Sequence, residues 1–145
     1  MTALYHCGPV VVRENDAGGG IPRWRVVAGG PTTSVRENPY EAKFIESTGL
    51  RLVIGKGGMD ATVLDACSRC GAVYLQAVGG AAAVTARSIR RVANVYFLEE
   101  FGAAEACWEF EVEDFRCVVG MDSHGVSLFD QIHEQSQCRF NELMR

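Results

Sequence analysis

The chain has 145 residues, which predicts a single domain spanning residues 1–145. Hydrophobic residues make up 48% and charged residues 22%, as in ordinary globular proteins, and the net charge of −4 argues against a general nucleic-acid binder. No apolar run is long enough for a membrane span, and the N-terminus has no signal-peptide pattern. We therefore expect a cytoplasmic protein without nucleic-acid or membrane partners, in which the six cysteines are mostly free thiols.

Apolar runs that end in glycine alternate with helix-like segments along most of the chain. This order of strand, helix and strand favours an α/β fold, in which helices cover a sheet that contains parallel strands. We expect strands at residues 8–14, 23–29, 50–58, 72–80 and 92–102, two short strands within 107–125, helices at 38–49, 59–71, 81–92 and 127–145, and a Gly-rich loop at 15–22.

Helix ends are marked by capping residues. Asn38 is expected to be the N-cap of the first helix, with Glu41 in the place of a capping-box acid and Gly49 at the end. Asp60 and Gly71 bound the second helix in the same way.

Three predicted strands end in glycine-containing turns before a helix, at Gly29–Gly30, Gly55–Gly58 and Gly79–Gly80. Ligands of open α/β sheets bind beyond the carboxyl ends of strands, where helix N-termini also attract anions. Two hydroxyls and two cations lie in the first two turns, which predicts a site for a small carboxylate or phosphate. The residues are Thr32, Thr33, Arg36 and Lys56.

Alternative interpretations remain for these and other residues. Arg36 and Lys56 can be ordinary solvated cations. Cys67 and Cys70 form a C-x-x-C pattern that can bind a metal or react as thiols. Because they share the apolar face of a predicted helix and no second C-x-x-C follows, a structural role is favoured. His6 is expected to be structural or exposed.

Six segments in this order resemble the β subunits of iron–sulfur hydro-lyases, namely the L(+)-tartrate dehydratase β subunit and the C-terminal domain of class I fumarases. The resemblance runs from Tyr5 to about Leu128. It implies a swivelling β/β/α domain with a mixed sheet and covering helices. The segments are "YHCGPVVV", "VVAGGPTTSVRENPYEAKFIESTG", "VIGKGGM", "AVYLQAVGGAAA", "EEFGAAEACWEFEVEDF" and "MDSHGVSL".

The resemblance also implies a reaction and a set of site residues. Such enzymes add or remove water on a hydroxy-dicarboxylate such as fumarate, malate or tartrate, with a [4Fe–4S] cluster that acts as Lewis acid on the hydroxyl. A cluster-bearing α subunit would hold that cofactor in a hetero-oligomer, so this chain would supply no cofactor or metal ligand. Thr32 would act as the base, and Thr33, Arg36 and Lys56 would bind the substrate carboxylates.

Family members carry a further segment before the "Y-x-x-GP" strand, with an arginine in an RD-x-x-H-like motif. The chain begins at Met1, just before Tyr5, and is therefore expected to be N-terminally short. The competing interpretation is a non-catalytic domain of this family that binds a dicarboxylate or a partner protein. A third is a thiol or metal protein that uses Cys67 and Cys70.

Overall fold

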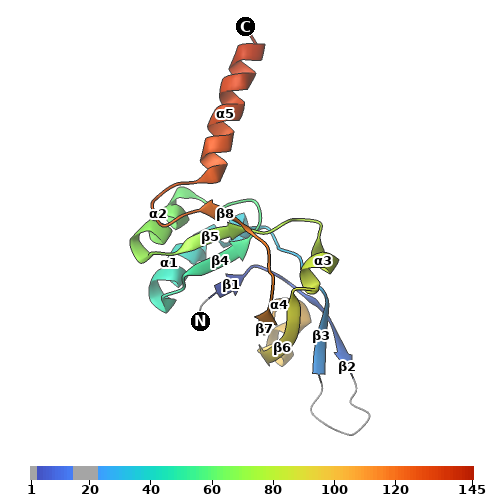
Figure 1. The fold of residues 1–145 in the computed structure, drawn as a ribbon. Coiled ribbons are helices and arrows are strands. Elements are labelled where there is room, and N and C mark those ends of the chain that lie inside the picture. Colours follow the sequence, from blue (N-terminus) through green and yellow to red (C-terminus); the bar gives the residue numbers. More distant parts are fainter. Residues whose placement is uncertain (1–2, 15–22) are drawn as a thin grey trace. The chain divides into compact units, whose positions relative to one another are not determined.

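The computed structural model describes residues 3–14 and 23–145 (Figure 1). The predicted loop at 15–22 lies outside these residues. The chain divides into two compact units, and the single domain of the sequence analysis stays a prediction. The first unit comprises Met1–His6, Thr33–Ala77 and Cys117–Arg145, and the second comprises Cys7–Thr32 and Val78–Arg116.

The first unit contains a mixed four-stranded sheet with the order β1-β4-β5-β8. The first three of these strands run parallel, and β8 pairs antiparallel with β5. Strand β1 was not predicted, because it has three residues and is too short to show a period of two. The strands are β1 (Ala3–Tyr5), β4 (Leu52–Gly55), β5 (Val73–Gln76) and β8 (Val118–Met121).

Two helices of the first unit, α1 and α2, contact each other beside this sheet (Figure 1). Successive right-handed crossovers that move in one direction along a sheet place their helices on the same face. The predicted α/β fold with a mixed sheet and covering helices is thus confirmed. The helices of this unit are the 3₁₀ helix η1 (Ser34–Glu37), α1 (Asn38–Thr48), α2 (Ala61–Cys70) and α5 (Leu128–Leu143).

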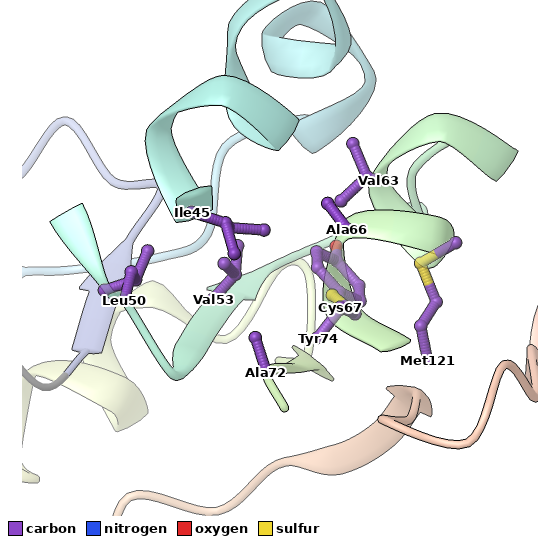
Figure 2. Close-up of a cluster of buried hydrophobic side chains, with 9 residues drawn as sticks. All are labelled: Ile45, Leu50, Val53, Val63, Ala66, Cys67, Ala72, Tyr74 and Met121. Atoms are coloured by element: carbon purple, nitrogen blue, oxygen red, sulfur yellow. The ribbon is translucent and has the colours of Figure 1, made fainter. Parts of the chain in front are cut away.

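A hydrophobic core lies between these helices and the sheet (Figure 2). It draws on both helices, on strands β4 and β5, and on Met121 of β8. Tyr74 is the largest side chain in it, and Phe129 of α5 packs against the Tyr74 ring edge-on, with 6.0 Å between ring centroids. The buried members are Ile45, Leu50, Val53, Val63, Ala66, Cys67, Ala72, Tyr74 and Met121.

The predicted helix caps are partly confirmed. Asp60 caps α2, and both Gly49 and Gly71 end their helices in the left-handed conformation. The prediction for Asn38 is wrong, because η1 precedes α1 directly and Asn38 is already helical; its side chain accepts a hydrogen bond from the Asp60 amide instead. Glu41 is not a capping-box acid either, since its carboxylate is buried against His6.

We expect Asp60→Ala to lower the free energy of unfolding by about 1 kcal/mol. The Asp60 carboxylate accepts hydrogen bonds from the amides of Thr62 and Val63, at 3.0 and 3.1 Å, and alanine leaves both amides unpaired. Asp65→Ala is the matched control, because Asp65 pairs only on the exposed surface with Arg69, one turn along the same helix. Urea unfolding curves of the two variants measure the difference, and equal midpoints would contradict the capping role.

The second unit is built from two antiparallel strand pairs, β2 with β3 and β6 with β7. Trp24 of β3 meets Trp108 of β7 edge-on, with 5.4 Å between ring centroids. Both strands predicted before residue 30 are confirmed. The elements are β2 (Val10–Glu14), β3 (Arg23–Ala28), α3 (Ala82–Ala86), β6 (Ile89–Tyr96), α4 (Leu98–Glu105) and β7 (Cys107–Val112).

The elements between residues 81 and 102 differ from the prediction. The predicted helix 81–92 ends at Ala86, because the chain from Ile89 onward pairs with β7; Arg91 faces Glu111 across this ladder. The predicted strand 92–102 stops at Tyr96, and Leu98–Glu105 is helical. From Ile89 onward, pairing with the distant strand β7 outweighed the local preference for a helix.

The other predicted strands and helices are present among the described residues. Residues 107–125 contain two strands as predicted, β7 and β8, and these two strands belong to different sheets. The C-terminal helix begins after Ser127, whose hydroxyl oxygen accepts a hydrogen bond from the Asp130 amide. Among the described residues, no helix is both long and apolar enough to cross a membrane.

Candidate functional site

Thr33 and Lys56 lie side by side at the carboxyl end of β4. The two residues form an isolated parallel bridge, and the Ser34 amide donates to the Lys56 carbonyl at 3.0 Å. The Gly57 amide donates to the side-chain oxygen of Gln76, which ends the neighbouring parallel strand β5. Two residues of the predicted anion site are therefore held together at the edge where ligands of α/β sheets bind.

The other two predicted site residues flank this bridge in the sequence. Arg36 lies in η1, the single 3₁₀ turn that begins directly after Thr33, and its side chain is exposed. Thr32 is half-buried and joined to Thr33 by one peptide bond, at the boundary of the second unit. Lys56 is half-buried and Arg36 is exposed, and the turn that carries Arg36 begins directly after the Thr33–Lys56 bridge.

Of the three strands that end in glycine-containing turns, β4 and β5 lie in one sheet and β3 lies in another. Strand β3 pairs with β2 and does not join the sheet of β4 and β5, because the two strands form their own antiparallel ladder. The Gly79–Gly80 turn belongs to the second unit, whereas Lys56 belongs to the first. The candidate site is therefore built on Thr33, Arg36 and Lys56, with Thr32 attached through the chain.

A buried polar network, which was not predicted from the sequence, adjoins the Thr33–Lys56 bridge through Ser34. His6 lies within hydrogen-bond distance of Ser34 Oγ at 2.9 Å and of Glu41 Oε2 at 3.1 Å, and the Tyr74 hydroxyl donates to Ser34 Oγ at 2.9 Å. The hydrogen-bonded partners in this network are 28, 35 and 40 positions apart in the chain. The single local signal was Ser34, a third hydroxyl residue after the two threonines, while the tertiary fold alone brings His6 and Glu41 to it.

The cysteines do not form a metal or cluster site in the described part of the chain. No group of three or more metal-binding side chains occurs there, and all six thiols are free. Cys67 is fully buried in the core, and burial, followed by the charges of Glu41 and Cys70, raises its pKa to about 11. These observations support the structural role expected for Cys67 and Cys70.

We expect the thiols to react with a disulfide reagent in the order of their exposure. Cys107 and Cys138 are exposed and react first, whereas Cys67 reacts only after unfolding, because it is inaccessible and its pKa leaves little thiolate at pH 8. Timed labelling followed by peptide mass spectrometry gives the order. Rapid native labelling of Cys67 would instead favour a reactive thiol centre.

A wide hollow of about 1060 Å³ lies in the second unit, and none of the predicted site residues lines it. Arginines line it, but several are already paired with carboxylates, such as Arg25 with Glu14 and Arg90 with Glu113. We assign it no role in catalysis.

Residues 1–132 match the family model described as "Fumarase C-terminus". A protein of Methanocaldococcus jannaschii assigned as L(+)-tartrate dehydratase subunit beta is 44% identical over 142 residues, which are 97% of this chain and 70% of that protein.

Two further relatives agree. A protein of Geobacillus stearothermophilus assigned as class I fumarate hydratase is 47% identical over 92% of this chain and 25% of its own length. The L(+)-tartrate dehydratase subunit beta of Escherichia coli K12 is 35% identical over 87% of this chain and 60% of its own length. Because dehydratases and hydratases are both hydro-lyases, these relatives confirm the predicted resemblance and enzyme class, and the chain belongs to the fumarase C-terminus family.

Proposed function

We propose that this chain is the β subunit of an iron–sulfur hydro-lyase that adds or removes water on a hydroxy-dicarboxylate of the fumarate, malate or tartrate type. The observation that carries the proposal is the Thr33–Lys56 bridge at the end of β4, with Arg36 on the helical turn that follows. The chain works in a hetero-oligomer with an α subunit. The cytoplasm is its place of action, which the six free thiols support.

Lys56 and Arg36 bind the substrate carboxylates. An arginine can hold a carboxylate with two parallel hydrogen bonds, and a lysine acts as a point charge. Loss of water beside a carboxylate begins with removal of the neighbouring proton, which spreads negative charge onto that carboxylate. Fixed cations at this place stabilise the transition state more than the ground state, so they contribute to kcat as well as to KM.

Thr32 takes the proton from the substrate carbon, and Thr33 helps to hold the substrate. A threonine hydroxyl is a weak base, and it accepts a proton only if its own proton moves to another group. The partner subunit supplies that group and excludes water from the site. The isolated chain is therefore expected to be inactive.

The [4Fe–4S] cluster belongs to the α subunit. A cluster needs several thiolates close together. On this chain Cys67 is buried among apolar side chains, and the described residues contain no suitable group of ligands. The residues present therefore do not fit a cluster, and the chain's own contribution is the substrate-binding edge.

The first experiment is an anaerobic pull-down of the tagged chain from its native lysate, with a visible spectrum of the eluate. A brown partner with Fe–S absorption, followed by turnover of fumarate, malate or tartrate, supports the proposal. A colourless eluate without a cluster protein would favour the non-catalytic alternative, a domain that binds a dicarboxylate or another protein.

In the assembled enzyme we expect Lys56→Ala to raise KM and lower kcat, with kcat/KM reduced by about 10²-fold. The reason is the loss of a cation from the carboxylate site, and Arg36→Ala should act in the same direction. Lys43→Ala is the control, because this other lysine is exposed on α1. Steady-state kinetics with each dicarboxylate provide the measurement, and wild-type constants for Lys56→Ala would contradict the assignment.

A further inference from the structure

Four polar side chains form one buried network in the first unit, and the proposed function leaves them without a role. Glu41, His6 and Ser34 are 3%, 7% and 0% exposed, and the Tyr74 hydroxyl completes the network from β5. A buried network of this kind costs stability unless each group is paired. Glu41 Oε1 has no partner among the described residues, so stability alone does not account for the network.

Ser34 Oγ is the centre of the network, and its hydrogen bonds can be counted. It accepts from the Lys56 amide at 3.1 Å and from the Tyr74 hydroxyl at 2.9 Å. A serine oxygen has two acceptor positions and one proton, so both acceptor positions are filled. The Ser34 proton must therefore be donated to His6 Nδ1, 2.9 Å away.

This count selects one form of His6. Because Nδ1 accepts the Ser34 proton, the ring is neutral and carries its own proton on Nε2, which donates to Glu41 Oε2 at 3.1 Å. The Tyr74 hydroxyl is the donor in its bond to Ser34, and burial raises the pKa of this hydroxyl, which keeps its proton in place. The direction of every hydrogen bond from Tyr74 to Glu41 is thereby set.

The order Ser34–His6–Glu41 resembles the triad of serine hydrolases, but Ser34 is no nucleophile. A nucleophilic serine needs an open side that faces the substrate. Ser34 is fully buried, and the absent side chain of Gly55 leaves just enough space for its oxygen; a Cβ at Gly55 would overlap Ser34 Oγ.

Ser34 instead ties the two substrate-binding segments together. Its amide donates to the Lys56 carbonyl, and its hydroxyl accepts from the Lys56 amide, so one residue holds both ends of the lysine's backbone. Thr33, its neighbour, forms the bridge to Lys56. When the Ser34 hydroxyl donates its proton to His6, its oxygen can still accept the hydrogen bond from the Lys56 amide.

We infer that Ser34 and His6 are positioning residues for substrate binding: His6, oriented by Glu41, holds the Ser34 hydroxyl in the one direction that fixes Lys56 beside Thr33. The inference rests on the proposed function, in which Lys56 binds a substrate carboxylate. A dicarboxylate binds tightly only if the groups that bind its two carboxylates are both in the correct position. A small displacement of Lys56 therefore weakens substrate binding strongly.

The first test reads the protonation of His6 directly. In the chain labelled with ¹⁵N-histidine and assembled with its partner subunit, NMR shows which ring nitrogen carries the proton, and His6→Gln identifies the His6 signals. The wild type should show the proton on Nε2. In Tyr74→Phe one acceptor position on Ser34 becomes free, so the form with the proton on Nδ1 should become detectable. A proton on Nδ1 in the wild type would overturn the inference.

The second test separates positioning from folding. Ser34→Ala and Tyr74→Phe each remove one hydroxyl of the network, but Ser34→Ala alone loses the bond to the Lys56 amide. We expect Ser34→Ala to raise KM for the dicarboxylate about tenfold or more, and Tyr74→Phe to change it less than about threefold. Equal KM values for the two variants would contradict a specific role of Ser34.

A third pair of variants tests His6. The side-chain oxygen of His6→Asn can replace Nδ1 as acceptor for Ser34, whereas His6→Gln reaches only toward Glu41. Asparagine should therefore preserve KM better than glutamine, and the reverse order would contradict the inference. If the wild-type complex turns over none of the dicarboxylates, the proposed function fails, while the NMR result still decides the arrangement of the network.

Discussion

Replacing Thr32 by valine is expected to lower the kcat of the assembled hydro-lyase by a factor of about 10²–10⁴, the range typical for loss of a general base. Valine keeps the shape of threonine and removes the hydroxyl, so the half-buried position stays filled. If Thr32 is the base, as proposed, the reaction loses its proton acceptor while substrate binding changes little. Steady-state kinetics of the complex, together with its thermal unfolding, measure both effects.

Thr32→Ser is the matched control. Serine retains the hydroxyl and should keep most of the turnover, with a moderate loss from its freer rotation. If valine and serine at position 32 give equal rates, or if Thr32→Val retains wild-type kcat, the hydroxyl of Thr32 is not the base. The neighbouring Thr33 hydroxyl would then be the next group to test.

Gly55→Ala is expected to lower the free energy of unfolding by about 3–5 kcal/mol, a large part of the stability of a small domain. The backbone at Gly55 does not require glycine, because its φ lies outside the left-handed region. Space is the constraint: an added Cβ would overlap Ser34 Oγ and lie 3.0 Å from His6 Nδ1 and 3.1 Å from the Tyr74 hydroxyl. The methyl group must displace a fully buried hydrogen-bond network.

Gly49→Ala provides the control for the glycine substitution itself. Gly49 ends α1 with φ of 68°, and a Cβ there meets nothing within 4 Å. Its cost should be the strain of a left-handed alanine, about 1–2 kcal/mol. Urea unfolding followed by circular dichroism compares the two variants. A smaller loss for Gly55→Ala than for Gly49→Ala would show that the network can move aside.

Local patterns in the sequence predicted the elements whose determinants lie close together in the chain. Asp60 and Gly71 bound α2 as expected, because a cap needs only the amides of the next turn and a residue that tolerates a left-handed backbone. Thr33 and Lys56 were predicted to lie in one site because each follows a predicted strand end, but their bridge joins two segments that are distant in the chain. Family motifs added the expected roles of these residues.

The tertiary structure decided what depends on distant partners. The segment from Ile89 is a strand because β7 pairs with it, although the alanine-rich sequence before it favours a helix. Glu41 is a buried hydrogen-bond partner of His6, 35 positions away, although its position in the sequence had predicted a capping-box acid. Capping and periodicity are local properties that a sequence displays, whereas strand pairing and buried hydrogen bonds depend on which segments fold against each other.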